Sequence, residues 1–286
     1  MDIIEILKAI LFGIVEGVTE WLPISSTGHL ILLNEVVPLD VSKSFYSMFQ
    51  VVIQLGAILA VVVLFWNQIW PFGKKDNKEP LQVKHIGPWI KTDIFKLWFR
   101  ILVSCVPAAI VGLKFDETFE ELFYNYQMVS IMLIIFGVAF IIIENRNQGR
   151  KSKVNTTAEI TYKLAFWIGM FQLIAAIFPG TSRSGATIVG ALLLGVSRKV
   201  AAEYTFYLAI PVMFGASLLK IWKFGLSFTF AEAGVLIISM VVAFAVSLFV
   251  IKFLMGYIKK HDFKVFGWYR IILGALVLIC GLVGLI

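Results

Sequence analysis

Long uninterrupted apolar stretches constrain this chain more than any other feature of its sequence. A helix needs about 20 apolar residues to cross a bilayer. Of the 286 residues, 59% are hydrophobic and 15% are charged, whereas soluble domains average about 45–50% and about 25%. The sequence therefore predicts an all-α polytopic membrane protein forming one membrane domain over residues 1–286. The six stretches long enough to span are roughly 45–66, 94–113, 126–143, 201–222, 233–254 and 267–286.

Two further apolar regions, residues 3–37 and 162–196, do not divide into full spans. Each consists of a long apolar arm, a short polar turn and a short apolar arm. The short arms, Leu30–Val37 and Ala186–Val196, are about ten residues long, which is too short to cross a bilayer. We therefore expect two re-entrant helical hairpins, each of which enters and leaves the membrane on one side.

The order of segments is one hairpin and three spans, followed by a second hairpin and three spans. Three is an odd number, so the second half begins on the opposite face, and the order predicts an inverted-topology repeat. The two halves cover about 1–143 and 162–286, joined by a cytoplasmic linker at about 144–161. An offset of 156 supports the repeat by aligning Gly13 with Gly169, Glu16 with Gln172, Pro23 with Pro179, Ser25 with Thr181 and Ser26 with Ser182.

Basic residues are distributed unevenly between the two sets of loops. Four loops (67–93, 144–161, 197–200 and 255–267) carry 14 Lys and Arg residues, and the three opposite loops carry 3. The basic side should be cytoplasmic, so the first hairpin should enter from outside and the second from inside, and their polar tips could meet near the midplane. The net charge of +7 has the same explanation and does not predict a nucleic-acid partner. The acidic start of the chain is untypical of a cleavable signal peptide.

Charged side chains inside apolar stretches are the strongest indication of function. An ionised group at bilayer depth costs at least about 2.5–3.5 kcal/mol, so Glu16, Glu20 and Arg183 need a partner or a water-filled cavity. Glu16 and Glu20 are spaced i, i+4, which places both carboxylates on one face of a helix. Such a pair can hold a divalent cation through oxygen ligands, or one of the two can act as a proton acceptor.

A polar turn follows the two acids. Pro23 is expected to end the first helix, because its ring cannot continue the hydrogen-bond ladder. Hydroxyls of the turn and freed backbone N–H groups of the next arm can bind phosphate oxygens, and His29 could act as base, acid or nucleophile. The turn could instead be only a helix cap, and His29 only a buried structural histidine. The candidate phosphate-binding residues are Ser25, Ser26, Thr27 and Gly28.

The second polar turn, Pro179–Thr187, is the more specific of the two. Arg183 offers a pair of N–H donors suited to phosphate; as a mere counter-ion for a glutamate it would still lie beside the acids. Gly180 and Gly185 allow a ligand to approach the backbone closely. The other candidates in this turn supply hydroxyl groups: Thr181, Ser182, Ser184 and Thr187.

Other polar residues in the apolar stretches carry weaker indications. Gln50 and Gln54, spaced i, i+4 on the first full span, could line a cavity or bridge helices. Arg100 and Arg270 lie near span ends, where a long cationic side chain is expected to reach out to the membrane surface.

At these residues the chain resembles the bacterial undecaprenyl-pyrophosphate phosphatases, a family linked to bacitracin resistance. The family pattern, E-x-x-x-E, P-x-S-S-T-G-H and then PGxSRSxxT, matches Glu16–Glu20, Pro23–His29 and Pro179–Thr187 in order. Length and segment plan match over essentially the whole chain. The resemblance implies hydrolysis of undecaprenyl pyrophosphate to undecaprenyl phosphate and inorganic phosphate, which recycles the lipid carrier for cell-wall synthesis. It also implies a divalent cation, Mg²⁺ or Ca²⁺, and a site facing the extracytoplasmic side of the bacterial plasma membrane.

These residues suggest a mechanism. Arg183 and the turn amides would hold phosphate charge, Glu16 and Glu20 would hold the metal, and Ser26 would be the nucleophile, activated by Glu20 or His29. Attack by His29 or by water is an alternative.

The alternative function is transport or flipping of a polyprenyl phosphate lipid, since broken helices in inverted repeats are typical of secondary transporters. The small residues of Gly190–Gly195 could form a homodimer face.

Overall fold

The long apolar stretches form helices in the computed structural model, which describes residues 2–74, 77–83, 86–225 and 227–284. These residues contain six helices long and apolar enough to cross a membrane and no strand beyond isolated bridges. The prediction of an all-α multi-pass membrane protein is therefore confirmed. The spans are Lys43–Leu64 (α3, Lys43–Val52, and α4, Gln54–Leu64), the first part of α6 (Thr92–Phe123), α7 (Tyr126–Asn147), α10 (Arg198–Phe224), α11 (Phe230–Tyr257) and α12 (Lys264–Leu282).

Two pairs of shorter helices occupy the predicted hairpin regions. The first pair is α1 (Ile3–Thr19) with α2 (Ser26–Val36), and the second is α8 (Tyr162–Ile177) with α9 (Arg183–Leu193); the members of each pair pack together. That each pair enters and leaves the membrane on one side stays a prediction. Three short elements lie in the connections: α5 (Trp66–Ile69), η1 (Gly87–Trp89) and η2 (Thr157–Glu159).

The bounds of the short helices correct the sequence expectation. The first arm ends at Thr19, four residues before Pro23, and the second arm begins at Ser26 rather than Leu30. In the second pair, α9 begins at Arg183 rather than at Ala186. Ser26 and Arg183, which were expected in the polar turns, are therefore the first residues of α2 and α9. There, backbone N–H groups without intrahelical acceptors accompany them.

The helix α6 also runs further than its apolar stretch. Residues 114–125 fall between the spans expected at 94–113 and 126–143 and were therefore expected to form a loop, yet α6 continues without a break to Phe123. Lys114–Phe123 contains neither glycine nor proline, and Glu and Lys favour helix. Hydropathy locates the part of a helix that suits lipid, and it does not locate the end of the helix.

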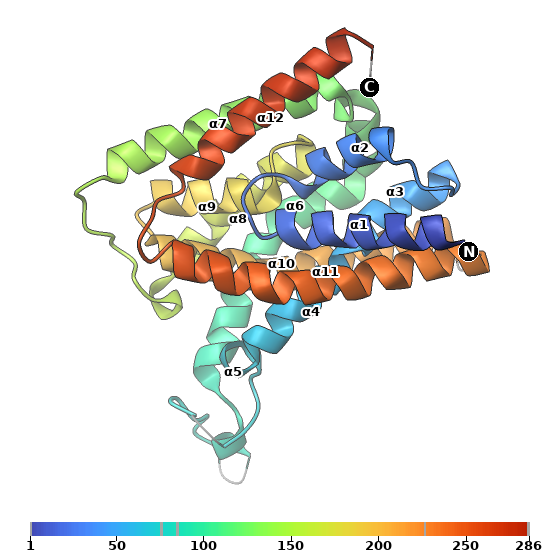
Figure 1. Cartoon of the computed structure of the whole chain (residues 1–286). Coiled ribbons are helices and arrows are strands. Elements are labelled where there is room, and N and C mark those ends of the chain that lie inside the picture. Colours follow the sequence, from blue (N-terminus) through green and yellow to red (C-terminus); the bar gives the residue numbers. More distant parts are fainter. Residues whose placement is uncertain (1, 75–76, 84–85, 226, 285–286) are drawn as a thin grey trace.

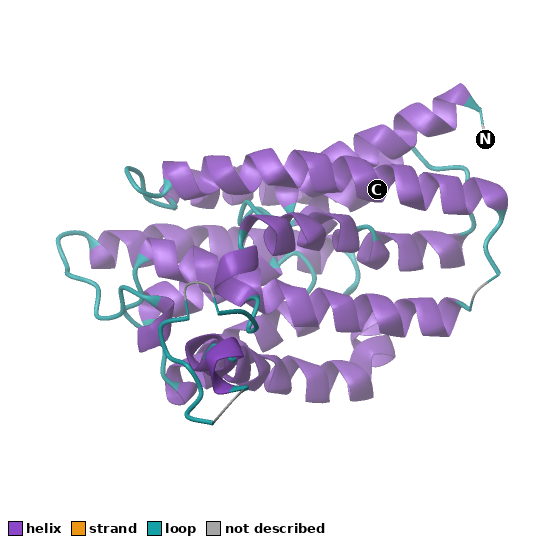
Figure 2. Ribbon diagram, turned by 90° about the horizontal axis from the view of Figure 1, so that it is seen from below, coloured by secondary structure: helices purple, strands orange, loops and turns teal. Residues whose placement is uncertain are grey.

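The helices of the two halves pack on one another in a symmetric way. The helix α1 packs on α11 and α8 packs on α6; α4 packs on α11 and α10 packs on α6. In the two halves α1 corresponds to α8, α4 to α10 and α6 to α11. The contact of α1 with α11 is therefore equivalent to that of α8 with α6, and the contact of α4 with α11 to that of α10 with α6. The last spans, α7 and α12, pack on each other and lie side by side in Figure 1. Most helices follow one direction, with loops gathered at their ends (Figure 2).

One hydrogen bond occurs twice at equivalent positions of this arrangement. Ser239 in α11 donates from Oγ to the carbonyl oxygen of Ala9 in α1 at 2.8 Å. Ser104 in α6 donates from Oγ to the carbonyl oxygen of Ala165 in α8 at 2.6 Å. Ala9 and Ala165 are 156 residues apart, the offset that aligns the two halves. This duplication supports a structural repeat, while the inversion of its halves across the membrane stays a prediction.

Close packing between α6 and α8 leads to a stability prediction. A Cβ on Gly169 would lie against the carbonyl oxygen of Ser104 and 2.8 Å from its Cα. Because these are backbone atoms, the two helices would have to separate. We expect Gly169→Ala to lower the free energy of unfolding by about 1–3 kcal/mol, measured as a lower thermal midpoint in detergent.

The control is Gly215→Ala in α10, where no described atom lies within 4 Å of an added Cβ. This change should leave the midpoint unchanged or raise it slightly, since alanine favours helix. An unchanged midpoint for Gly169→Ala would contradict the close approach of α6 and α8.

The short helix α9 is almost entirely buried. Every α9 residue from Ser184 to Leu192 is buried, among the largest cluster of buried apolar side chains. A Cβ on Gly190 would overlap the side chain of Phe171, so buried Gly190 is not available for the expected homodimer face, while the homodimer itself stays a prediction. Trp21, next to Glu20 in the sequence, packs edge-on against Phe206 with ring centroids 5.3 Å apart. The polar ends of α1 and α9 are therefore fixed by well-packed surroundings.

Candidate active site

The two short helices begin at serine caps that share an unusual backbone conformation. Ser25 has φ +75° and Ser182 has φ +66°, and no other non-glycine residue in the described ranges has a positive φ. Ser182 Oγ accepts a hydrogen bond from the Gly185 amide at 3.1 Å, and Ser25 Oγ accepts one from the Gly28 amide at 3.5 Å. Left-handed backbone at residues other than glycine is costly and is found at functional sites.

These caps also correct the alignment of the two halves. By geometry Ser25 corresponds to Ser182, not to Thr181, because the serine cap lies two residues after Pro23 in the first half and three residues after Pro179 in the second. Ser26 consequently corresponds to Arg183, not to Ser182. Each of these two residues is the first residue of its short helix.

The carboxylate of Glu20 joins these two equivalent positions. Glu20 Oε2 accepts a hydrogen bond from Ser26 Oγ at 2.7 Å, and Oε1 accepts one from Arg183 Nη2 at 3.0 Å. The Glu20 and Arg183 side chains are only 5% and 13% exposed, so their attraction is weakly screened by solvent. The structure thus brings together three of the predicted catalytic residues: Ser26, Glu20 and Arg183.

Further hydrogen bonds fix this cluster. Arg183 Nη1 donates to the carbonyl oxygen of Thr205 in α10 at 3.0 Å, which leaves the guanidinium spanning α1 and α10. Ser184 Oγ donates to the Glu20 carbonyl oxygen at 3.3 Å and lies 3.1 Å from Ser182 Oγ. Because the Ser184 hydroxyl donates its proton to the Glu20 carbonyl oxygen, the Ser182 hydroxyl is the donor in the hydrogen bond between the two serines. The cap of α9 therefore positions the backbone of Glu20.

A small cavity of about 150 Å³ opens at the cluster between the two helix starts. Both N-termini contribute to its wall, and a helix N-terminus favours anions through its free N–H groups and its dipole. Gly28, Thr181, Ser184 and Thr187 do not line this cavity, and Thr187 instead contacts Thr205 Oγ1 at 2.9 Å. The polar and glycine residues that line it are Glu20, Ser25, Ser26, Thr27, Gln54, Gly180, Ser182 and Arg183.

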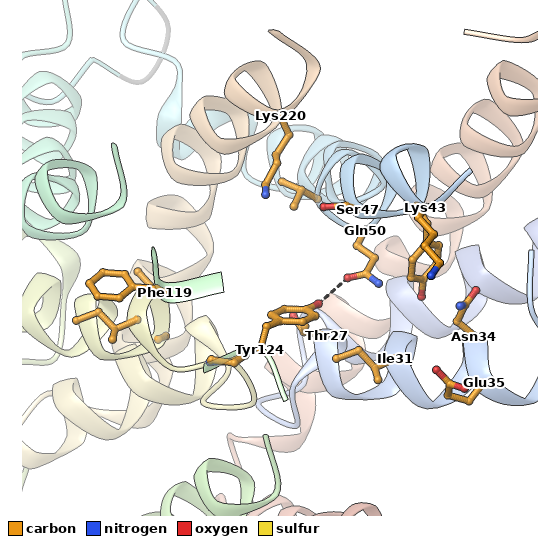
Figure 3. A pocket seen from close by; sticks show the side chains of 16 residues that line it. Thr27, Ile31, Asn34, Glu35, Lys43, Ser47, Gln50, Phe119, Tyr124 and Lys220 are labelled. Atoms are coloured by element: carbon orange, nitrogen blue, oxygen red, sulfur yellow. Dashed lines mark hydrogen bonds between the residues drawn. The ribbon is translucent and has the colours of Figure 1, made fainter. Parts of the chain in front are cut away.

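A larger cavity of about 480 Å³ adjoins this one, and both are lined by Thr27, Ala175 and Pro179. Figure 3 shows Lys220, Gln50 and Tyr124 pointing into the larger cavity from different elements. The Tyr124 hydroxyl donates to Gln50 Oε1 at 2.7 Å. Gln50 and Gln54 thus line successive cavities, as their i, i+4 spacing allows, and the larger cavity offers a route to Ser26.

Glu16 lies one helical turn before Glu20 and is fully buried. Neither of its carboxylate oxygens has a hydrogen-bond partner within the described part of the chain, and an unpaired buried charge is costly. The described residues contain no cluster of three or more His, Cys, Asp or Glu side chains that could hold a metal ion by themselves. Two carboxylates completed by phosphate oxygens and water are a common arrangement for Mg²⁺. Glu16 lines neither cavity, but Glu20, one turn away, lines the smaller one. The two carboxylates therefore fit a divalent cation at the edge of this cavity.

His29 points away from the nucleophile candidate. Its Nδ1 lies 2.7 Å from the carbonyl oxygen of Ser25, so Nδ1 is the donor there. Its Nε2 lies 2.7 Å from the hydroxyl of Tyr269, and the two rings stack with an interplanar angle of 8°. Both ring nitrogens are occupied, and neither contacts Ser26. Of the two activators predicted for Ser26, Glu20 is the one within hydrogen-bonding distance.

Arg270 contacts both polar turns, which the sequence did not predict. The expectation that it reaches the membrane surface is wrong, because its side chain is fully buried. Its Nη1 donates to the carbonyl oxygen of Pro23 at 3.2 Å, and its Nη2 donates to those of Gly180 and Thr181 at 2.9 and 2.8 Å. One guanidinium thereby ties both turns together. The one sequence feature that points to burial is that Arg270 is the seventh residue of α12 and so lies inside the helix and not at its end.

Gly180 is required by its own backbone and its neighbours. It has φ +85°, and a Cβ there would lie 2.7 Å from the Cα of Val129. Gly28 differs, since the nearest atoms to an added Cβ are 3.7–3.8 Å away at ordinary contact distance. The side-chain hydroxyl of Thr181 is buried and has no hydrogen-bond partner among the described residues.

Comparison with known proteins gives matches over nearly the full chain. The family model for bacitracin resistance protein BacA matches residues 9–276. An undecaprenyl-diphosphatase of Desulfitobacterium hafniense is 62% identical over 279 residues, which cover 98% of this chain and 97% of the relative. Undecaprenyl-diphosphatase 1 of Clostridium acetobutylicum is 61% identical, and an undecaprenyl-diphosphatase of Enterococcus faecalis is 59% identical, each over 279 residues and 98% of both chains.

Proposed function

This chain belongs to the bacitracin resistance protein BacA family, and from this premise we propose that it hydrolyses undecaprenyl pyrophosphate to undecaprenyl phosphate and inorganic phosphate. The observation that carries the proposal is the hydrogen-bonded cluster of Ser26, Glu20 and Arg183 at one small cavity. It combines a nucleophile, a base and a phosphate-binding cation. The reaction recycles the lipid carrier for cell-wall synthesis. Bacitracin resistance follows, because bacitracin sequesters the pyrophosphate form.

In the first step, Ser26 Oγ attacks the terminal phosphorus of the pyrophosphate. Glu20 Oε2, 2.7 Å from Oγ, accepts the hydroxyl proton as the new O–P bond forms. The bond between that phosphorus and the bridging oxygen breaks, and undecaprenyl phosphate leaves with the bonding electron pair. The proton on Glu20 passes to the departing phosphate, so the carboxylate is ionised again.

In the second step, water hydrolyses the phosphoserine. Glu20 accepts a proton from the water while the hydroxide bonds to phosphorus, and Ser26 Oγ leaves and takes that proton. Inorganic phosphate is released and the serine is restored. Arg183 and the N-termini of α2 and α9 stabilise negative charge on the phosphoryl oxygens in both steps. The Nε of Arg183, buried without a partner in the described ranges, is a further donor.

A divalent cation, Mg²⁺ or Ca²⁺, is part of the proposal. Glu16 and Glu20 would hold it, and the unpaired carboxylate oxygens of buried Glu16 support this assignment. When bound, the cation would neutralise charge on the two phosphate groups and orient them. The site would open to the extracytoplasmic face of the bacterial plasma membrane, because the larger cavity lies near the end of α10 that is remote from the basic loops.

Metal removal gives the corresponding prediction. We expect EDTA to lower the rate of phosphate release by at least about tenfold, since the charge of the pyrophosphate then repels Glu20 and the attacking oxygen. Added Mg²⁺ or Ca²⁺ should restore the rate. An unchanged rate after exhaustive chelation would remove the metal from the proposal and leave the serine mechanism in place.

The proposed activity is tested with purified protein in detergent supplied with undecaprenyl pyrophosphate. Inorganic phosphate and undecaprenyl phosphate should appear in equal amounts. Transport is the second candidate function, favoured by the symmetric packing of the two halves, and a pure transporter would release no phosphate without compartments. Absence of both products from folded, lipid-supplemented protein would therefore reject the phosphatase in favour of transport.

A further inference from the structure

A second polar cavity, of about 450 Å³, lies at the opposite end of α10 from Lys220. We call it the basic cavity, because seven Lys and Arg residues line it, with Glu144 as the one acidic residue in its wall. None of these side chains belongs to the cluster around Ser26. The cavity lies among the loops that the charge distribution places in the cytoplasm.

Backbone and side-chain hydrogen bonds hold the wall of the basic cavity in place. The amides of Lys153 and Val154 both donate to the carbonyl oxygen of Gly195, at 2.8 and 3.3 Å, and the Ser197 amide donates to the Val154 carbonyl oxygen at 2.9 Å. These bonds fasten the linker after α7 to the connection between α9 and α10. Asn147 Nδ2 donates to the Leu192 carbonyl oxygen at 3.0 Å. The cations in this linker are therefore held over the start of α10.

Three of the seven cations already have a stabilising partner. Arg198 forms a two-pronged ion pair with Glu144, with N···O distances from 2.6 to 3.1 Å. Lys199 lies 3.7 Å from Glu203. Arg146 is in the last turn of α7, where the helix dipole favours a cation. These three do not call for a further anion.

The other four cations, Arg150, Lys151, Lys153 and Lys259, lack a carboxylate within 4.0 Å in the part of the chain that the structure describes. The N-terminus of α10 opens onto the same cavity, and the side chain of Ser197 makes no cap hydrogen bond there. The first amides of a helix without a cap are free donors, and they add to the attraction for an anion.

We propose that the basic cavity binds a phosphate group. A phosphate carries several oxygens that can accept hydrogen bonds from Lys, Arg and helix amides at once. Such a group is available as the headgroup of an anionic membrane lipid or as free inorganic phosphate, and basic cavities between membrane helices suit lipid headgroups in particular. Because this site shares no residue with the Ser26 cluster, the proposal is independent of the proposed hydrolysis.

Binding is tested with a variant that removes three cations whose side chains form no ion pair: Arg150→Gln, Lys151→Gln and Lys153→Gln together. The matched control removes three exposed cations that do not line the cavity: Lys74→Gln, Lys78→Gln and Lys163→Gln. Each protein is placed in phosphatidylcholine nanodiscs containing a small share of phosphatidylglycerol, and retained lipid is counted by native mass spectrometry. A separate arm measures binding of radiolabelled inorganic phosphate without phosphatidylglycerol.

We expect the cavity variant to bind the preferred ligand at least about tenfold more weakly than wild type, with the control within about twofold, because each nearby cation contributes attraction. Loss of phosphatidylglycerol retention identifies a lipid headgroup, and loss of inorganic phosphate binding identifies the free ion. Equal binding by wild type and both variants in both arms would overturn the proposal. Phosphate release from undecaprenyl pyrophosphate should be normal in all three proteins, which confirms that they are folded.

Discussion

Replacing Ser26 by alanine is expected to lower kcat for undecaprenyl pyrophosphate by at least about 10³-fold, with a small change in KM. The substitution removes the oxygen that forms the bond to phosphorus, and loss of a nucleophile abolishes most of the rate gained through covalent catalysis. Substrate binding should persist, because Arg183 and both helix N-termini are unchanged. The measurement is initial phosphate release over a range of substrate concentrations.

The matched control is Ser44→Ala, at an exposed serine outside both cavities around Ser26, which should retain wild-type kinetics. Near wild-type turnover by Ser26→Ala would reject the serine mechanism. Direct attack by water, or attack by His29 after a movement that breaks its bonds to Ser25 and Tyr269, would then be the alternatives.

Replacing Glu20 by glutamine is expected to lower kcat by about 10²–10⁴-fold, the usual contribution of a general base. Glutamine keeps an oxygen that can accept from Arg183, but it no longer accepts the Ser26 proton. The same change at Glu79, an exposed residue paired with Lys96 at 2.7 Å, serves as the control and should have no effect on phosphate release. Thermal midpoints in detergent separate loss of catalysis from loss of fold.

Comparison of Glu20→Gln with Glu16→Gln distinguishes the two acids. Glu16 makes no hydrogen bond to Ser26 or Arg183, whereas Glu20 makes both. If Glu16 acts mainly as a metal ligand, Glu16→Gln should raise the Mg²⁺ concentration needed for half-maximal activity and recover at high Mg²⁺. Glu20→Gln should not recover. Recovery of both variants would contradict the role of Glu20 as base.

The spans could be predicted from sequence because lipid imposes a length and a composition on them. The first span was expected at 45–66 and lies at Lys43–Leu64. The end of α6 could not be predicted in this way, since Lys114–Phe123 is polar enough for water and still favours helix. The one-residue shift between the halves was also hidden, because Ser25 aligns with a hydroxyl residue at either offset, Thr181 or Ser182. The positive φ of Ser25 and Ser182 could not be predicted either, because serine is not a residue type that indicates this backbone conformation.

The residues of the site were found because charge inside an apolar stretch is rare and therefore informative. Glu20 and Arg183, far apart in sequence, lie 3.0 Å apart in the structure. Side-chain direction was not predictable: nothing in the sequence turns His29 toward Tyr269. Arg270 was missed because a cation near a span end is ordinarily solvated at the membrane surface. Three of its four carbonyl acceptors come from turns whose approach depends on the whole fold.

The most direct test of Ser26 as nucleophile follows labelled phosphorus during one turnover. Enzyme is mixed with undecaprenyl pyrophosphate labelled at the terminal phosphate, and samples are quenched early in acid and in alkali. Phosphoserine survives acid and is lost in alkali, whereas phosphohistidine shows the reverse. We predict acid-stable label on the peptide that contains Ser26, and none in Ser26→Ala. Label that survives only in alkali, or phosphate release without any labelled protein, would contradict the assignment.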